Sequence, residues 1–121
     1  MSFIALIANL VIFGVAAIHI YILVLEMFLW DKPKGLKVFG QTQAQATASK
    51  VLAANQGLYN GFLAAGLFWG LLMGNQGLGI KVFFLLCVLI AGVYGGLTAN
   101  QRILYVQALP AAIGLALLGL V

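Results

Sequence analysis

Long hydrophobic stretches dominate the chain, and polar residues collect in the segments between them. Four such stretches cover about residues 3–30, 51–73, 80–99 and 103–121. An α-helix needs about 20 residues, at a rise of 1.5 Å each, to cross about 30 Å of hydrocarbon. The pattern therefore predicts an all-α polytopic membrane protein with a single domain over residues 1–121, built as a bundle of four transmembrane helices.

The connections between the predicted helices are one long segment and two short ones. The long connection, residues 31–50, follows the first helix, and Pro33 interrupts helical structure there. Its apolar residues alternate with lysines, as expected of a piece that lies on the membrane surface. From Gln41 onward the residues favour helix, so we expect the second helix to begin before the bilayer. Short loops at 74–79 and 98–102 make consecutive helices antiparallel neighbours.

Composition and charge support a membrane location and indicate an orientation. The chain is 64% hydrophobic and 7% charged, whereas roughly a quarter of the residues in soluble domains are charged. Its net charge of +4 arises mostly from lysines around residues 31–50, with Arg102 in the third connection. In a bacterial inner membrane the positive-inside rule makes 31–50 and 98–102 cytoplasmic and both termini external. Because the cations gather in a connection rather than along a helix face, nucleic acid is excluded as a partner.

Candidate chemistry begins with two ionisable residues in the first hydrophobic stretch. His19 is the single histidine, and Glu26 is one of two acids. Such side chains are costly inside a membrane unless they are paired, so they mark a function or a structural role. They are seven residues apart, nearly two helical turns, and we expect both on one helix face.

Other polar residues reach the same half of the membrane when their depth is estimated from the helical rise. We expect them to surround Glu26 and His19 and to bind a ligand: Asn55, Gln56, Tyr59 and Asn60 on the second helix, and Arg102 and Tyr105 on the fourth. The sequence thus predicts a cytoplasm-facing intramembrane pocket for a lipid-like or other amphipathic small molecule.

Two interpretations of this polar cluster stay open. In the first, Glu26 and His19 are ligand contacts or a general acid/base pair, and Arg102 recognises an anionic head group. In the second, the same network only fixes the order of the helices in a non-catalytic assembly or scaffold subunit. The sequence leaves open whether the protein is an enzyme. Without a Walker loop, a CxxC motif or a second histidine, no cofactor and no metal site are predicted.

Glycines recur at four-residue spacing on two of the predicted helices. Gly57 with Gly61, and Gly66 with Gly70 and Gly74, lie on the second helix, and Gly92 with Gly96 lies on the third. Such small-xxx-small faces let helix backbones approach closely in lipid. They predict either tight packing within the bundle or a homo-oligomer.

Two strings of the chain resemble a known family. Ile18-His-Ile-Tyr-Ile-Leu-Val-Leu-Glu-Met-Phe-Leu-Trp30 and Ala54-Asn-Gln-Gly-Leu-Tyr-Asn-Gly-Phe-Leu-Ala-Ala-Gly66 are similar to the signature segments of a small bacterial membrane family, domain of unknown function 1304. The similarity covers essentially the whole chain. It implies a four-helix integral membrane protein without an assigned activity.

The chain also resembles, more distantly, the MAPEG group of eicosanoid and glutathione enzymes, which are small four-helix membrane proteins. Their Arg-Ala-x-x-Asn-x-x-Glu pattern holds glutathione between the subunits of a trimer. When its asparagine is aligned with Asn55, Val51 and Leu58 occupy the two charged positions. The resemblance therefore implies a MAPEG-like enzyme only as a further alternative, in which Asn55, Arg102 and Tyr105 would carry over.

Overall fold

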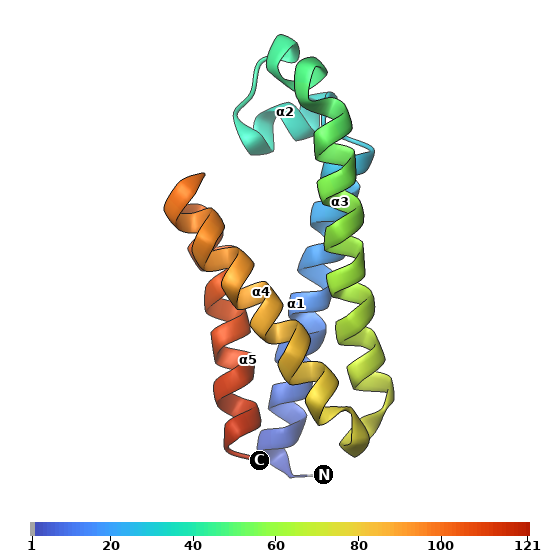
Figure 1. The fold of residues 1–121 in the computed structure, drawn as a ribbon, viewed down its shortest axis with the longest axis vertical. Coiled ribbons are helices and arrows are strands. Elements are labelled where there is room, and N and C mark those ends of the chain that lie inside the picture. Colours follow the sequence, from blue (N-terminus) through green and yellow to red (C-terminus); the bar gives the residue numbers. More distant parts are fainter. Residues whose placement is uncertain (1) are drawn as a thin grey trace. The chain divides into compact units, whose positions relative to one another are not determined.

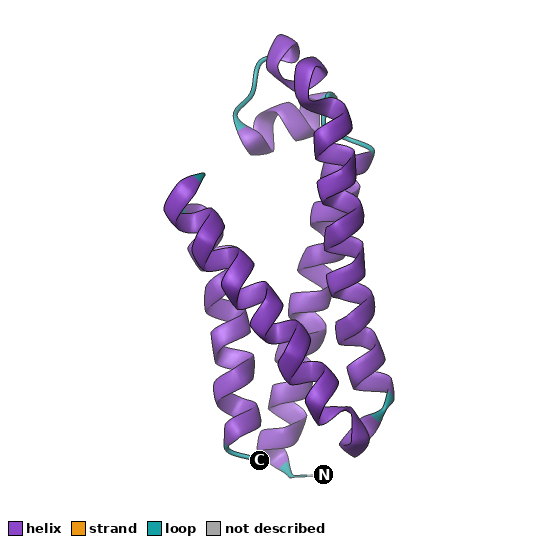
Figure 2. Cartoon of the chain, viewed as in Figure 1, coloured by secondary structure: helices purple, strands orange, loops and turns teal. Residues whose placement is uncertain are grey.

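The computed structural model describes residues 2–121, and all regular secondary structure in that range is helical (Figure 1, Figure 2). The all-α prediction is therefore confirmed. In chain order the elements are α1 (Phe3–Met27), α2 (Pro33–Phe39), α3 (Gln43–Leu72), the 3-10 helix η1 (Gly74–Gly77), α4 (Leu78–Thr98), the π-helical turn η2 (Leu104–Ala108) and α5 (Leu109–Gly119).

Two helical stretches among residues 2–121 have the length and apolar composition of a membrane span. They are Phe3–Met27 and Gly74–Thr98, each 25 residues long. Leu104–Gly119 is apolar but shorter, and α3 is not among these candidates, since polar residues occur in it from Gln43 to Asn60. The structure thus suggests a membrane location, while four spans and their orientation stay predictions.

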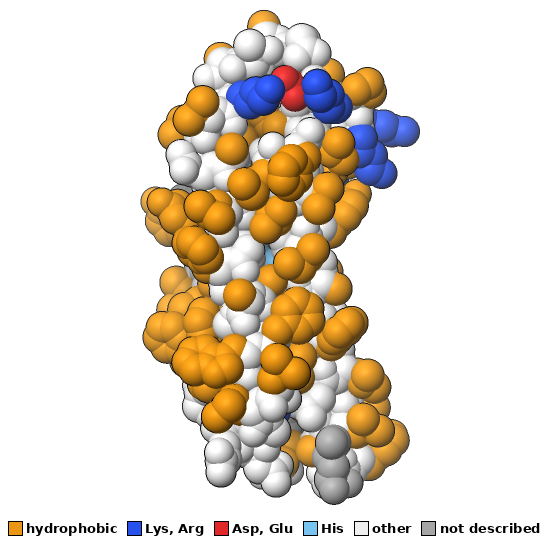
Figure 3. Space-filling model, turned by 90° about the vertical axis from the view of Figure 1, so that its right-hand side faces the viewer, with side chains coloured by type: hydrophobic (Ala, Val, Ile, Leu, Met, Phe, Trp, Pro, Cys, Tyr) orange, Lys and Arg blue, Asp and Glu red, His pale blue; other side chains and the backbone are white. Residues whose placement is uncertain are grey.

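Large hydrophobic side chains cover much of the molecular surface. Figure 3 shows them spread over the face in view, with Lys and Arg side chains gathered near one acidic side chain. The most exposed include Leu72 at 87%, Phe3 at 76% and Val51 at 75%. An apolar surface this extensive is typical of a protein that contacts lipid or another protein.

The chain divides into two compact units, and both contain parts of α1 and α3. Unit one combines the residues up to Ala16 with residues 65–121, so it holds the start of α1, the end of α3, η1, α4, η2 and α5. Unit two is Ala17–Ala64, with the end of α1, all of α2 and the larger part of α3.

In unit two, glycines bring α3 against the end of α1. A Cβ atom on Gly57 would lie 2.6 Å from Cγ of Met27, and one on Gly61 would lie 2.7 Å from Cδ1 of Leu23. A larger side chain at either position would require the contacting side chain of α1 to shift. Gly57 and Gly61 thus contact α1 of the same chain, and a homo-oligomer through glycine faces stays a prediction.

Local sequence features determine the structure of the connection from α1 to α3. α1 ends at Met27 rather than at residue 30, and Pro33 stands in the first turn of α2, where its missing N–H costs nothing. Gly40, with φ of 63°, adopts the left-handed conformation that ends α2. The structure has the short helix α2 in this connection, and its location on a membrane surface stays a prediction.

A capping box starts α3 well before the predicted membrane entry. The backbone N–H of Gln45 donates to Oγ1 of Thr42 at 3.1 Å, and the N–H of Thr42 donates to Oε1 of Gln45 at 3.0 Å. This reciprocal pair satisfies two donors that a helix start otherwise leaves unpaired. It explains why α3 begins at Gln43, consistent with the expected early start.

In unit one, α4 packs against η2 and α5 through small residues. A Cβ on Gly92 would lie 2.6 Å from the backbone nitrogen of Ala108, and Gly96 faces Leu104 closely. The predicted fourth helix is not continuous: the N–H of Leu109 donates to the carbonyl of Leu104, which forms a π-helical turn before α5. Pro110, in the first turn of α5, has no N–H for regular α-helical bonding, which favours such an irregularity.

Candidate functional site

The candidate site is a buried carboxyl–amide pair in unit two. Nδ2 of Asn60 on α3 donates a hydrogen bond to Oε1 of Glu26 on α1, at 2.6 Å. Glu26 is 4% exposed and Asn60 7% exposed. A buried carboxyl group without a hydrogen-bond partner is costly, so Asn60 compensates part of the cost of placing Glu26 there.

Gly57 is the reason that Asn60 reaches Glu26. At Gly57 the two helices approach so closely that an added Cβ would lie 3.1 Å from Cβ of Glu26. Asn60 follows three residues later, on the same face of α3. The short amide side chain of Asn60 can span the remaining distance because the glycine has brought the backbones together.

His19 is buried completely on the same helix as Glu26. The two residues are seven positions apart on α1 and both are buried, which agrees with the expected shared face. Their separation along the helix axis is about 10 Å. His19 and Glu26 therefore do not form a hydrogen-bonded dyad, and an acid/base mechanism would need a substrate long enough to reach both.

The other predicted ligand contacts on α3 lie away from this pair. Asn55, Gln56 and Tyr59 are exposed, Tyr59 at 60%. The face of α3 that carries Gly57 and Asn60 packs on α1, and the rotation of the helix turns the other three side chains outward. Of the four polar residues predicted on the second helix, the structure brings Asn60 to Glu26.

Arg102 and Tyr105 belong to unit one. Arg102 is exposed, and its backbone N–H donates to Oδ1 of Asn100 at 2.9 Å. Tyr105, 62% exposed, lines an open groove of about 300 Å³. The rest of its lining is apolar: Leu89, Leu104, Ala108, Leu109 and Ala112. The contribution of Arg102 and Tyr105 to a ligand site stays a prediction.

A second buried polar pair was not predicted from the sequence. In unit one, Nζ of Lys81 on α4 donates to Oδ1 of Asn9 on α1 at 3.0 Å, and Lys81 is 6% exposed. Neither Lys81 nor Asn9 was among the candidate residues predicted from the sequence. The signal in the sequence was the amide of Asn9 in the first half of α1, where the other side chains are apolar.

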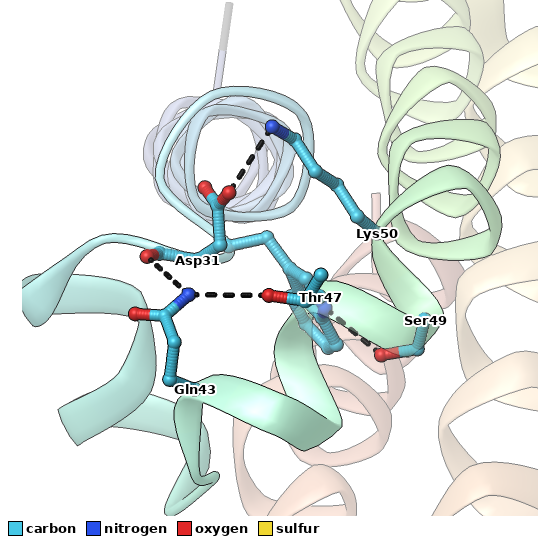
Figure 4. Close-up of polar contacts among 6 residues, drawn as sticks. Asp31, Gln43, Thr47, Ser49 and Lys50 are labelled. Atoms are coloured by element: carbon cyan, nitrogen blue, oxygen red, sulfur yellow. Dashed lines mark hydrogen bonds and ion pairs between the residues drawn. The ribbon is translucent and has the colours of Figure 1, made fainter.

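A third set of polar contacts joins the end of α1 to the start of α3 within unit two (Figure 4). Nζ of Lys50 lies 3.1 Å from Oδ2 of Asp31, and Nε2 of Gln43 donates to the backbone carbonyl of Asp31 at 3.3 Å. Nε1 of Trp30 donates to Oγ of Ser49 at 3.1 Å. The hydrogen bond from Lys50 lowers the pKa of Asp31 below its ordinary value.

Side chains that could bind a metal ion are few and do not cluster among residues 2–121. Among residues 2–121, no group of three or more His, Cys, Asp or Glu side chains could hold a metal ion. Every buried side-chain nitrogen or oxygen atom in the same range has a hydrogen-bond partner. The chemistry of the candidate site is therefore that of a carboxyl group, an amide and an imidazole.

These features define a small all-helical protein with two helices of membrane length and a buried carboxyl–amide pair. The chain belongs to the family described as "Protein of unknown function (DUF1304)", which matches residues 13–119. The resemblance recognised in the two sequence strings is thereby confirmed, whereas the likeness to MAPEG enzymes gains no support.

A relative from the same comparisons is similar over most of its length. It is "Uncharacterized protein YpaA" of Lactococcus lactis subsp. lactis (strain IL1403), which is 31% identical over 109 residues, covering 88% of this chain and 87% of the relative. No solved structure gives a significant match. The family and this relative carry no assigned activity, so a function has to be argued from the site.

Proposed function

We propose that this is a multi-pass inner-membrane protein whose Glu26–Asn60 pair binds the polar head of a lipid-like or other amphipathic small molecule. The observation that carries the proposal is the carboxyl group of Glu26, which is 4% exposed and accepts a hydrogen bond of 2.6 Å from Asn60 on the neighbouring helix α3. Ionisable residues inside membrane segments are expensive, and a functional role is the default expectation for them.

The chemistry of the pair suggests the kind of head group. A carboxyl group and a primary amide together offer both acceptors and donors, which suits a hydroxyl or an amine. An apolar tail would lie along exposed hydrophobic side chains of the same unit, such as Val24 and Phe28. His19, about 10 Å further along α1, would contact only a ligand that extends along the helix.

A copurification experiment tests the ligand site. Glu26→Gln keeps an oxygen acceptor for Asn60 but removes the ionisable group, so the helix contact is retained. Asp31→Asn neutralises the other acid of the chain and is the matched control. Native mass spectrometry and solvent extraction of the purified full chain should find a bound small molecule in wild type and Asp31→Asn, reduced at least about tenfold in Glu26→Gln. Equal retention in all three proteins would contradict the proposal.

The proposed orientation places residues 31–50 and 98–102 in the cytoplasm and both termini outside. It is supported by the concentration of lysines in 31–50 and by the positive-inside rule. A topology reporter fused after Val121 should report an external location, and one inserted after Gly40 a cytoplasmic location. The opposite pair of results would reverse the orientation.

A second candidate function is that of a non-catalytic assembly or scaffold subunit. It is favoured by the complete pairing of buried polar atoms among residues 2–121, because a network without open partners can serve helix packing alone. In that case wild-type protein purifies without a small molecule, and gentle extraction with crosslinking yields a larger complex. A mass measured in detergent and in lipid would also decide whether the chain forms a homo-oligomer.

A further inference from the structure

The connecting segment, residues 30–50 of unit two, is held in a fixed conformation. The rings of Trp30 and Phe39 lie 4.7 Å apart between centroids, and Trp30 also donates to Ser49 at the start of α3. Gly35 is buried, packed directly on the backbone carbonyl of Leu29. These contacts hold the backbone of α2 close to the residues that follow α1.

Three lysines of the connecting segment form no salt bridge among residues 2–121, although the charge of Lys32 helps to lower the pKa of Asp31. Lys32, Lys34 and Lys37 are exposed. The chain has only two acids: Asp31 pairs with Lys50, and Glu26 is buried against Asn60.

The spacing of these lysines concentrates their charge. Lys34 and Lys37 are three residues apart on α2, so they project from the same side of that helix. Lys32 directly precedes the helix as its N-cap residue. The three ammonium groups form a local excess of positive charge, which we call the lysine surface.

Apolar side chains and the end of α1 indicate the environment of the lysine surface. Phe28 is 63% exposed and Phe39 is 37% exposed, so aromatic rings accompany the charges. α1, a helix of membrane length, ends at Met27, only a few residues before Lys32. If α1 spans the bilayer, the lysines stand at the level of the lipid head groups, and lysines beside aromatic rings are typical of that level.

We propose that the lysine surface, Lys32, Lys34 and Lys37, binds the phosphate groups of anionic phospholipids in the leaflet where α1 ends. Each ammonium group can donate charge-assisted hydrogen bonds to phosphate oxygens. The proposal rests on the proposed membrane placement, but it does not depend on a ligand at Glu26. Anionic lipids are favoured over zwitterionic ones because the surface has an uncompensated positive charge.

Lipid titrations of the full chain test the proposal. Purified protein in detergent is mixed with phosphatidylglycerol or with phosphatidylcholine of the same acyl chains, and bound lipid is counted by native mass spectrometry. Wild type should bind phosphatidylglycerol more tightly than phosphatidylcholine. Replacing the three lysines by glutamine should weaken phosphatidylglycerol binding about fivefold for each lysine, or about a hundredfold in total.

A charge-retaining variant controls for damage to the fold. Replacing the same three lysines by arginine should preserve the preference, and circular dichroism should show equal helix content in all variants. Inorganic phosphate should not displace the lipid, because it has no apolar chains to lie beside Phe28 and Phe39. Equal binding of the two lipids by wild type, an unchanged preference in the glutamine variant, or displacement by inorganic phosphate would each overturn the proposal. The readout is lipid preference rather than a copurified ligand, so this proposal and the Glu26 site fail separately.

Discussion

Replacing Asn60 by leucine tests whether the carboxyl–amide pair stabilises the contact between α1 and α3. Leucine has the same number and branching of side-chain heavy atoms as asparagine but no donor, so Glu26 loses the hydrogen bond of 2.6 Å. Hydrogen bonds between membrane helices average about 0.6 kcal/mol, and leaving a buried polar group unpaired costs about 1–3 kcal/mol. Because Glu26 is 4% exposed, water cannot easily replace the amide. We expect Asn60→Leu to lower the free energy of unfolding by about 1–3 kcal/mol.

A double-mutant cycle gives this prediction its control. Glu26→Met removes the other partner with little change in shape, and buried polar pairs replaced entirely by apolar residues are often neutral or more stable. The variant with both changes should therefore be more stable than Asn60→Leu alone, measured by reversible unfolding of the full chain in mixed micelles. If the two single effects simply add in the double variant, Glu26 and Asn60 are not energetically coupled and the reasoning fails.

Three further changes test the rest of unit two, and Gly14→Ala in unit one is a control. Gly35→Ala would drive a methyl group into the backbone carbonyl of Leu29 and should cost about 1–3 kcal/mol of unfolding free energy, whereas Gly14→Ala, with open space around it, should cost nothing. Thr42→Ala should cost about 1 kcal/mol in the same assay by removing the cap of α3. The pKa of Asp31 is lowered from 3.8 in the folded chain, so its contribution to stability is present above pH 3.8 and is lost as the pH falls through the folded pKa. Asp31→Asn should therefore make the unfolding temperature depend less on pH below about pH 4.

The helical fold and the shared face of His19 and Glu26 were predictable, because they depend on local hydrophobicity and on helical periodicity. For the partner of Glu26, the sequence indicated a group of polar candidates rather than Asn60 alone. Depth estimates fix how far along an axis a residue lies, but the rotation of α3 decides which side chain faces α1. That rotation is set by the close approach at Gly57, which turns Asn60 inward and Tyr59 outward. Such packing is a property of two helices together, so one helix read alone does not reveal it.

Four helices were predicted, whereas residues 2–121 form five α-helices, and two helical stretches have the length and composition of a membrane span. α3 is a single helix of 30 residues, but its polar first half keeps it from being a clear membrane span. The capping box of Thr42 and Gln45 begins this helix in polar sequence, and no hydrophobic signal is needed there. Capping thus determines where α3 begins, whereas hydropathy determines which part of it could lie in a membrane.

Two polar pairs among residues 2–121, one buried and one part-buried, allow a comparison between structural and functional roles. Each pair joins an ionisable side chain to an asparagine on another helix: Glu26 to Asn60, and Lys81 to Asn9. If both pairs served packing alone, removing the charge while keeping a hydrogen-bonding group should change stability little at either place. Glu26→Gln and Lys81→Gln would then behave alike in every assay. A ligand that is lost in Glu26→Gln and retained in Lys81→Gln would separate the roles, because the variants differ in which ionisable group is removed.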